Sequence, residues 1–275
     1  VAITFAIPAD AREAFSFQPG QFLTLRAKVN GEDVRRNYSI SSPRSRLAKA
    51  GEMEIGIRPV EGGVFSNWAA QSLKAGDTLS VMPPDGRFVV KKQRAIHRVG
   101  FAAGSGITPI LSLAASTLEE QPESKFTPVY GNRRMSSAMF NEALQDLKDR
   151  YPNRLTLIHI LSRQAQEVDL LQGRIDGDKV RAVIKALLPG ASMDEVFICG
   201  PEAMIEATEK ALIDAGVPDS RVYSERFTSG PAQAAKIQAD TDAAPTRAAA
   251  AKDIALTIVL DGKEHELQIG PDEHV

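Results

Sequence analysis

The sequence is poor in cysteine, tryptophan and histidine: its 275 residues include one Cys, one Trp and four His. One cysteine, Cys199, cannot form an internal disulfide, and a chain without disulfides suits a reducing compartment, so we expect a cytoplasmic protein. The four histidines show no metal-ligand spacing, so we expect no metal site among the residues present.

Excess charge and long apolar runs are also scarce. The formal net charge is only −2, which provides no general attraction to nucleic acid or to anionic lipid. The longest weakly polar stretch, residues 99–116, is interrupted by Gly104, Gly106 and Pro109, so it predicts a strand, a loop and a helix instead of a membrane span. Neither nucleic acid nor a membrane is therefore an expected partner.

The chain does contain enough residues for about two domains, with 43% hydrophobic and 25% charged residues. Residues 1–93 show short strand patterns separated by turn residues, which is typical of a small antiparallel β-barrel. Residues 94–228 change to repeated strand, loop and helix, which predicts an α/β domain with a parallel sheet.

The C-terminal residues predict a linker and a hairpin. Residues 229–252 are rich in alanine but are interrupted by Pro231 and Pro245, which favours a linker. Residues 253–275 start with strictly alternating apolar residues and an Asp261-Gly262 turn, a strong hairpin signal. Because a lone hairpin is marginal in water, we expect it to start a third domain that this chain does not finish.

A glycine-rich segment, Gly104-Ser105-Gly106-Ile107-Thr108-Pro109, joins a predicted strand to a predicted helix. At such a position, backbone N–H groups and the positive end of the helix can receive a pyrophosphate, and glycine lets the phosphate approach the backbone. Pro109 stands where the usual dinucleotide motif has its third glycine. A tight strand-to-helix turn without a ligand is an equally good interpretation of this segment alone.

A second motif, Arg36-Asn37-Tyr38-Ser39, lies on a predicted barrel strand, where Arg36 and Tyr38 share a face. A guanidinium suits a pyrophosphate and a phenol ring can stack on a flavin. The alternative is an ordinary edge strand. The segment Gly63-Val64-Phe65-Ser66 favours the ligand, because a glycine turn before a helical serine offers N–H and hydroxyl donors to the same phosphates.

A third motif, Cys199-Gly200-Pro201, follows a buried strand at the edge where α/β sheets bind ligands. A free buried cysteine usually serves packing, but Gly200 would let a ring approach its sulfur. No adjacent His or acid in the sequence would activate the thiol, so covalent catalysis is not expected. Ser162-Arg163, at the same sheet edge, could hold an additional phosphate or could be a solvated loop.

In this order, the motifs resemble those of the ferredoxin–NADP reductase superfamily. The resemblance extends over nearly the whole chain. It includes four further segments: Pro19-Gly20-Gln21-Phe22, residues 130–133, residues 173–177 and Glu225-Arg226-Phe227. It implies an antiparallel β-barrel FAD-binding domain in residues 1–93 and an α/β NAD(P)-binding domain in residues 94–228. It further implies that residues 253–275, after the linker, begin an incomplete plant-type ferredoxin domain of the β-grasp fold.

The resemblance also implies residue roles. Arg36 and Ser66 would hold the FAD pyrophosphate, Tyr38 would pack on the flavin, and Phe227 would lie beside it. Ser39, Cys199 and Glu225 would be the catalytic residues, near the flavin N5 and the nicotinamide. The full set of implied cofactor-binding residues is Arg36, Asn37, Tyr38, Ser39, Gly63, Val64, Phe65, Ser66, Gly104, Gly106, Thr108, Arg133, Ser162, Arg163, Gly200, Pro201 and Phe227.

The implied activity is electron transfer: NADPH reduces FAD, which passes electrons through a [2Fe–2S] cluster to the di-iron oxygenase component of a multicomponent complex. Ser162 and Arg163 match the positions that read the 2′-phosphate of NADPH. Plant-type clusters need four cysteines, and Cys199 cannot replace them, so the cluster is expected only in the complete protein.

Three alternatives stay open at this point. The acceptor could be another oxygenase or a demethylase. The chain could be a flavin-binding sensor or assembly module without turnover. It could also be a structural α/β scaffold whose glycine loops are only turns.

Overall fold

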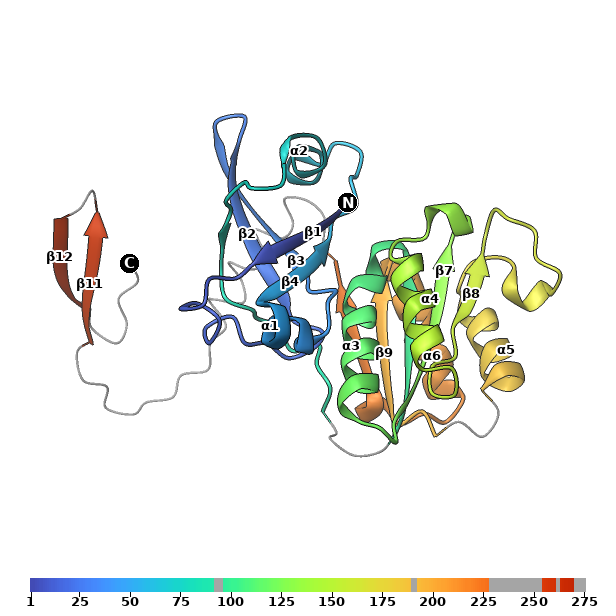
Figure 1. Ribbon diagram of the computed structural model, residues 1–275. Helices are drawn as coiled ribbons and strands as arrows, with labels where there is room; N and C mark the ends of the chain where they lie inside the picture. Colours follow the sequence, from blue (N-terminus) through green and yellow to red (C-terminus); the bar gives the residue numbers. More distant parts are fainter. Residues whose placement is uncertain (92–95, 189–191, 228–253, 261–262, 270–275) are drawn as a thin grey trace. The chain divides into compact units, whose positions relative to one another are not determined.

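The computed structural model describes residues 1–91, 96–188, 192–227, 254–260 and 263–269 (Figure 1). Two compact units divide the chain, Val1–Phe227 and Thr228–Val275. The first unit contains a β-rich N-terminal lobe and an α/β lobe, so the boundary expected near residue 93 lies inside one compact unit. The predicted linker, residues 229–252, lies outside the described residues.

The N-terminal lobe is built from short antiparallel strands and two helices. Its elements are β1 (Ala2–Ala6), β2 (Phe22–Val29), β3 (Glu32–Ser39), α1 (Arg44–Ala50), β4 (Glu52–Gly56), α2 (Val64–Ser72) and β5 (Ser80–Val81). Strands β1 and β4 form one small sheet, and β3, β2 and β5 form another. A bridge between Ile40 and Ile55 links them around the buried Leu23, Leu25 and Met53.

Strand β3 and helix α1 show how local sequence shapes this lobe. After Ser39 the chain passes Pro43, which has no N–H for a sheet and forms the N-cap of α1. Gly51 ends α1 in the left-handed conformation, with φ 68°. Helix α1 has no counterpart among the predicted elements, because seven residues are too few for a clear helical periodicity.

The α/β lobe contains a five-stranded parallel sheet in the order β10-β9-β6-β7-β8. Its strands are β6 (His97–Ala103), β7 (Lys125–Asn132), β8 (Ile158–Leu161), β9 (Glu195–Gly200) and β10 (Val222–Arg226). Its helices are α3 (Ile107–Glu120), α4 (Asn141–Arg150), α5 (Gly177–Leu187) and α6 (Glu202–Asp214), with 3₁₀ turns η1 (Gly104–Gly106), η2 (Met135–Ser137), η3 (Asp169–Leu171) and η4 (Asp219–Arg221).

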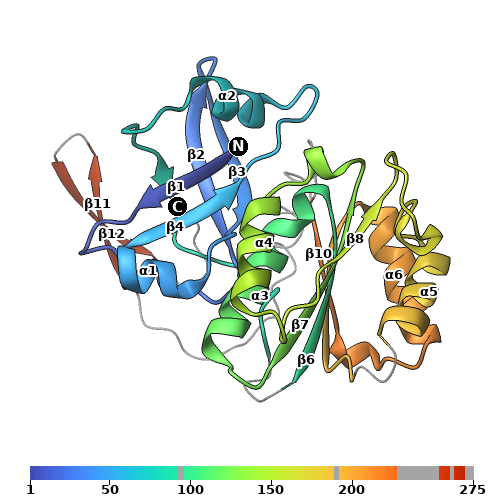
Figure 2. The same ribbon diagram turned by 45° about the vertical axis from the view of Figure 1, so that its right-hand side comes forward.

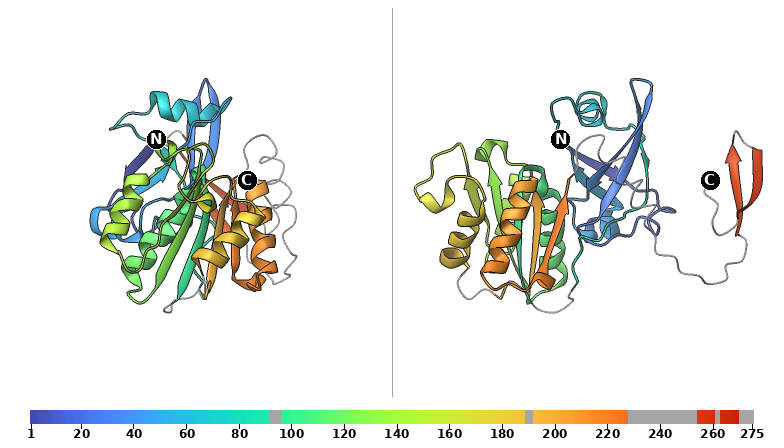
Figure 3. Two further views of the ribbon diagram at one scale, coloured as in Figure 1. Left: turned by 90° about the vertical axis from the view of Figure 1, so that its right-hand side faces the viewer. Right: turned by 180° about the vertical axis from the view of Figure 1, so that it is seen from behind.

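This lobe has three layers, with α3 and α4 on one face of the sheet and α5 and α6 on the other (Figure 3). Each face has its own apolar core: Val99, Val129 and Ile198 face α5 and α6, whereas Gly100 and Ala102 belong to the opposite face with Ile110. This confirms the predicted α/β architecture with a parallel sheet.

A buried ion pair lies at the amino ends of the central strands. Arg98 on β6 and Glu195 on β9 are direct register partners, and Arg98 Nε lies 2.8 Å from Glu195 Oε2 with both side chains 0% exposed. Gln121 accepts from Arg98 Nη1 at 2.7 Å, and the Lys91 N–H donates to Glu195 Oε1 at 2.9 Å. The apolar strand pattern gave no sign of this pair.

The predicted hairpin is confirmed in the second unit. Strands β11 (Ile254–Leu260) and β12 (Lys263–Ile269) pair antiparallel, and Leu260 is the register partner of Lys263. This register leaves two residues for the turn, as the Asp261-Gly262 signal requires. The turn residues themselves lie outside the described residues.

We expect Arg98→Met to lower the free energy of unfolding by about 3–5 kcal/mol, because it leaves a buried carboxylate without its guanidinium. Urea denaturation followed by circular dichroism measures the loss. The matched control is Arg181→Met, since Arg181 pairs with Asp178 while 48% exposed and should contribute less than about 1 kcal/mol. Equal losses in the two variants would contradict this assignment.

Candidate functional site

The order of the parallel strands places the candidate site at the carboxyl ends of β6 and β9. The chain leaves β6 toward β7 on one side and returns to β9 on the other, so these two neighbours form the point where the strand order reverses. Ligands of open α/β sheets bind at such a point. The segments Gly104–Gly106 and Cys199–Pro201 both lie there.

These two segments are in direct contact. A Cβ atom on Gly106 would lie 2.0 Å from the carbonyl oxygen of Cys199, so only glycine fits at this position. Gly104 has φ +57°, a conformation that favours glycine. Two motifs that are about a hundred positions apart in sequence therefore form one surface.

The start of helix α3 has the features of an anion site. Its N-cap, Gly106, provides no side-chain hydrogen bond to the first turn, and the Ile107 N–H donates to the Gly104 and Ser105 carbonyls of the preceding 3₁₀ turn, so it is the positive end of the helix that would attract an anion. Thr108 is buried, however, and its Oγ1 donates to the Ser105 carbonyl at 3.0 Å. Ser105 is the partly exposed side chain of this loop.

Arg58 is a site residue that the motifs did not reveal. It follows β4 in the N-terminal lobe, and its Nη1 lies 2.8 Å from the position that a Gly104 Cβ would occupy. An exposed guanidinium from one lobe thus covers the glycine loop of the other. Only a fold that brings residues 58 and 104 together could identify it, since no sequence motif joins them.

The three predicted catalytic residues converge. Ser39, at the end of β3, donates through Oγ to Glu225 Oε2 at 3.0 Å, across 186 positions of sequence. Glu225, on β10, is the register partner of Cys199 on β9. Burial raises the pKa of Glu225 to about 7, and the hydrogen bond from Ser39 opposes this rise. The carboxyl can therefore gain or lose a proton near neutral pH.

Cys199 itself is fully buried. Burial, and then the charge of Glu225, raise the pKa of its thiol well above the usual value. A thiol is a poorer nucleophile than a thiolate. The neighbouring Gly200 is closely packed, since a Cβ there would lie 2.7 Å from Met204 Cε.

The second motif is divided between the two faces of β3. Tyr38 is half-buried with its ring 5.7 Å from that of Phe65, and burial raises its pKa to about 12. Arg36 is exposed on the same face by the two-residue period. Asn37 lies on the other face, where its Oδ1 accepts from Thr24 Oγ1 at 2.9 Å.

The start of α2 lies next to this face. Ser66 is buried and its Oγ accepts from the Val60 N–H at 3.4 Å. A Cβ on Gly63 would lie 2.4 Å from Ser66 Oγ, so only glycine lets this hydroxyl pack directly against the turn. Phe65 is buried core, whereas Val64 is 44% exposed.

The predicted phosphate-reading residues lie at the ends of β7 and β8. The Arg163 N–H donates to the Arg133 carbonyl at 2.8 Å, and the Ser162 N–H to the Asn132 carbonyl at 2.9 Å. Both arginine side chains are exposed at this edge. Two exposed guanidinium groups beside a hydroxyl are suited to a phosphate.

The remaining predicted residues lie at the ends of elements. Pro201 is the N-cap of α6, and Phe227, which is 41% exposed, follows β10 directly. Among the residues that the structure describes, none of the helices could span a bilayer, and no three His, Cys, Asp or Glu side chains form a group suited to a metal.

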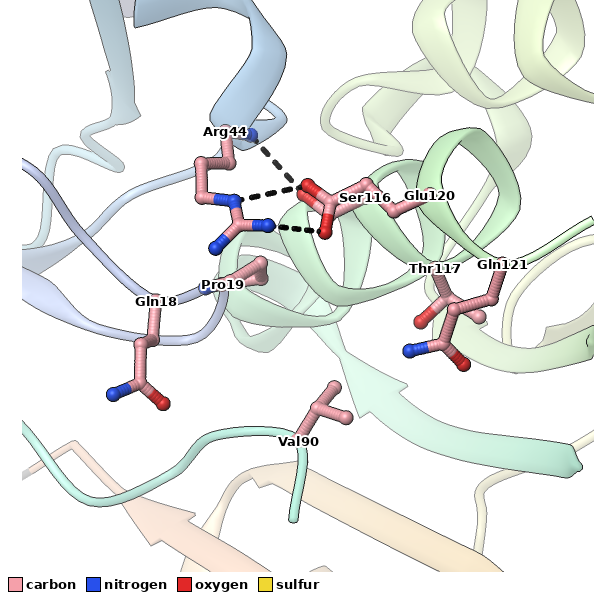
Figure 4. Close-up of a pocket in the computed structure, with 8 residues that line it drawn as sticks. All are labelled: Gln18, Pro19, Arg44, Val90, Ser116, Thr117, Glu120 and Gln121. Atoms are coloured by element: carbon pink, nitrogen blue, oxygen red, sulfur yellow. Dashed lines mark hydrogen bonds and ion pairs between the residues drawn. The ribbon is translucent and has the colours of Figure 1, made fainter. Parts of the chain in front are cut away.

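A pocket between the lobes lies elsewhere, at the opposite end of α3 (Figure 4). Arg44 and Glu120 form a bidentate pair there, with Nη2 to Oε2 at 2.6 Å and Nε to Oε1 at 3.0 Å. The charged groups of this pocket thus satisfy each other. None of the predicted catalytic or cofactor-binding residues lines it, although Pro19 of the Pro19-Gly20-Gln21-Phe22 segment does.

The folded site fits the two nucleotides that the motifs suggest. The close glycine packing at residues 104–106 and the uncapped start of α3 suit a dinucleotide phosphate, and Tyr38 beside the Gly63–Ser66 turn suits a flavin nucleotide. The residues of this chain do not provide the four cysteine ligands of a plant-type [2Fe–2S] cluster, because the sequence has one cysteine.

Comparison with known proteins agrees with this geometry. Residues 2–90 match the oxidoreductase FAD-binding domain and residues 101–210 the oxidoreductase NAD-binding domain. The chain is 42% identical over 276 residues to a subunit of the 1,2-phenylacetyl-CoA epoxidase of Escherichia coli K12, covering 99% of this chain and 74% of the relative.

The chain is also similar to a further relative and, in fold, to a solved structure. The ferredoxin reductase component of the 3-ketosteroid-9-alpha-monooxygenase of Rhodococcus rhodochrous is 35% identical, with 97% of this chain and 71% of the relative covered. The FAD/NAD-binding domain of nitric oxide dioxygenase from Vibrio cholerae has the same fold, with a TM-score of 0.69 at 21% identity, covering 82% of this chain and 91% of that one.

Glu225 should make folding stability depend on pH. A carboxyl with a pKa near 4.5 when unfolded and about 7 when folded binds its proton more tightly in the folded chain. This stabilisation is complete below the unfolded pKa and is lost as the pH rises through the folded pKa. The free energy of unfolding of the native chain should therefore fall by on the order of 2–3 kcal/mol relative to that of Glu225→Gln when the pH is raised from ~4.5 to ~8.

Urea denaturation across this pH range measures the effect. The second arm is Ser39→Ala, which removes the hydrogen bond that lowers the Glu225 pKa and should shift the loss of stability to higher pH. A constant difference between the native chain and Glu225→Gln across the range would show that Glu225 does not titrate as described.

Proposed function

Because this chain belongs to the ferredoxin–NADP reductase family of FAD- and NAD-binding oxidoreductases, we propose that it is the NADPH-dependent reductase of a multicomponent oxygenase, specifically of phenylacetyl-CoA epoxidase. The observation that carries the proposal is the convergence of Ser39, Glu225 and Cys199 where the two lobes meet. It joins the two halves of the site, each of which suits one nucleotide.

The residues of the chain have distinct tasks in this proposal. Arg36 and Ser66 hold the pyrophosphate of FAD, and Tyr38 packs on its flavin ring. The Gly104–Gly106 loop, the start of α3 and Arg58 receive the pyrophosphate of the nicotinamide nucleotide. Glu225 holds a proton near neutral pH and orients Ser39 Oγ. When bound, FAD and the nicotinamide nucleotide supply the hydride-transfer chemistry itself.

The onward path involves residues outside the site. We propose that the β11–β12 hairpin belongs to a plant-type ferredoxin domain whose four cysteine ligands are not among the residues of this chain. The hairpin supports this assignment. The 42% identity to an epoxidase subunit supports an oxygenase component as the acceptor, and its di-iron centre is proposed from the family resemblance alone. The described residues take part in electron transfer only as far as FAD; the later steps would need the cluster and the oxygenase.

An anaerobic stopped-flow experiment tests the reductase proposal. The chain is loaded with FAD and mixed with NADPH, and the flavin absorbance is followed. Loss of the oxidised-flavin band within seconds is expected. FAD that stays oxidised would support a non-catalytic flavin-binding module instead.

The second candidate function is reduction of a different oxygenase, which the 35% identity to a monooxygenase reductase favours. Purified oxygenase components of the epoxidase and of the ketosteroid monooxygenase can each be tested as acceptors for the complete protein. Faster reduction of the ketosteroid enzyme would overturn the epoxidase assignment without affecting the reductase proposal.

Cofactor preference should depend on Arg163. We expect Arg163→Ala to raise the KM for NADPH about ten- to a hundredfold and to leave the KM for NADH almost unchanged, because a lost charge-assisted phosphate contact costs about 1.5–3 kcal/mol. Steady-state kinetics with both nucleotides measures this. Equal effects on both nucleotides would reject the assignment.

Arg58→Ala provides the contrasting variant. Since the pyrophosphate is common to NADPH and NADH, and Arg58 lies over Gly104, this variant should raise both KM values by a similar factor of about ten. Selectivity for one nucleotide in Arg58→Ala would place the 2′-phosphate beside Gly104 instead of beside Arg163.

A further inference from the structure

Helix α3 presents a row of small hydroxyl side chains to the N-terminal lobe. Thr108, Ser112 and Ser116 are four residues apart, so they share one face of the helix, and each is at most 2% exposed. Their polarity sets them apart from the apolar residues that surround them on α3. Figure 2 shows α3 between the sheet and the N-terminal lobe, with α1 beside it.

Two hydroxyl residues of this row meet a specific partner in the N-terminal lobe. Ser112 Oγ donates to the Ser42 carbonyl at 2.7 Å, and the Arg44 N–H donates to Ser116 Oγ at 3.1 Å. These short side chains let the backbone of residues 42–44 lie directly on the helix. Hydrogen bonds of this length fix the register between the two surfaces, since a slide of the helix along its axis would break them.

The far end of α3 is held by charged contacts. Arg44 pairs with Glu120 (Figure 4). Ser45 Oγ donates to Glu119. Together with Ser112 and Ser116 they attach α3 to the start of α1 along more than two helical turns.

The near end of α3, next to the candidate site, is held by a tight apolar contact. A Cβ atom on Gly56, the last residue of β4, would lie 2.5 Å from Phe140 Cε2 and 2.7 Å from Thr108 Cγ2. Phe140 has φ 56°, which is unfavourable for a bulky residue and persists only where packing enforces it. The two lobes therefore touch here with no space for one extra methyl group.

The contact surface between α3 and the N-terminal lobe, which we call the seam, includes Gly56, Ser42 and Arg44 on one side and Thr108, Ser112 and Ser116 on the other. Short stretches of chain join it to both halves of the site. Ser42 follows Ser39 by three residues, and α3 starts directly after Gly106. Ser42 Oγ also accepts from the Glu54 N–H at 3.0 Å, which ties it to β4. A shift of α3 against the N-terminal lobe would thus displace the proposed nicotinamide loop relative to the proposed flavin strand.

We propose that Gly56 and Ser112 are positioning residues, which set the separation of the flavin and nicotinamide rings by fixing α3 against the N-terminal lobe. The proposal rests on the proposed reductase function. A misplacement of about 1 Å between reactants can slow a reaction about a hundredfold, so a methyl group at Gly56 acts on the rate of hydride transfer more than on binding.

Gly56→Ala is the central variant, and Gly100→Ala is its matched control. Gly100 is also a buried strand glycine, and a Cβ there would lie 2.7 Å from Ile110 Cγ2. Both variants overpack a buried contact with a residue on or beside α3, but the contact of Gly100 with Ile110 lies between α3 and its own sheet, whereas the contact of Gly56 lies between the two lobes. Thermal unfolding should therefore show destabilisation in both, which controls for general damage.

Three measurements on the FAD-loaded chains separate positioning from stability. In stopped-flow reduction at saturating NADPH, Gly56→Ala should be about ten- to a hundredfold slower than the native chain, whereas Gly100→Ala stays within about threefold. The Kd for NADP⁺ should change less than about threefold in both. The flavin–nicotinamide charge-transfer absorbance, which needs no turnover, should be weakened only in Gly56→Ala.

Two further variants cover the case in which Gly56→Ala does not fold. Ser112→Ala should slow flavin reduction about three- to tenfold, because it removes the hydrogen bond to Ser42 while adding no atoms. Its control is Thr208→Val on α6, which alters a buried hydroxyl without a hydrogen-bond partner in the described part of the chain and should leave the rate unchanged. Gly56→Ala combined with Phe140→Leu, which removes the nearest ring atoms, should recover part of the rate.

The outcomes distinguish failure of the positioning role from failure of the reductase function. If Gly56→Ala and Gly100→Ala slow reduction equally, or if Ser112→Ala matches the native rate and absorbance, the positioning role is overturned. If the native FAD-loaded chain itself is not reduced by NADPH, the reductase function fails instead.

Discussion

The site depends on the missing side chain of Gly106. Because the backbone of the loop after β6 lies against the Cys199 carbonyl, the carboxyl ends of β6 and β9 form one continuous surface. The same contact sets where α3 begins, and α3 in turn carries the residues that hold the N-terminal lobe. A larger residue at position 106 would separate the sheet edge from the helix, and both the Gly104–Gly106 loop and the contacts of α3 with the N-terminal lobe would shift.

The meeting of the lobes explains the unusual chemistry of Glu225. A carboxyl at the end of an edge strand would normally be solvated, but β3 brings Ser39 against it, and the loss of water raises its pKa to about 7. Cys199 is buried separately, in the core of the α/β lobe, and this burial, followed by the charge of Glu225, raises the pKa of its thiol. The apposition of β3 and β10 therefore accounts for the raised pKa of Glu225.

Much of this fold follows from local sequence patterns. The change from short strands to repeated strand and helix, the glycine loop after β6 and the Asp261-Gly262 hairpin depend on neighbours in the chain, and for that reason they were predictable. The motif residues could also be placed at strand ends, where α/β proteins bind ligands. The features that could not be predicted join distant residues: Arg58 over Gly104, the buried pair of Arg98 and Glu195, and the hydroxyl row on α3. In the sequence, Arg98 is a charged residue inside an otherwise apolar strand. Its partner, the Glu195 carboxylate, can be identified only from the register between β6 and β9.

The polar character of the seam has a physical consequence. Leucine or phenylalanine side chains would bury more apolar surface between the lobes, but apolar packing is not directional and tolerates sliding. Hydrogen bonds to Ser42 and Arg44, in contrast, weaken steeply with misalignment, so they define one position of α3. If α3 positions two bound nucleotides as proposed, a defined position matters more than additional buried area, which is consistent with serine and glycine at places where a stable interface alone would favour larger apolar residues.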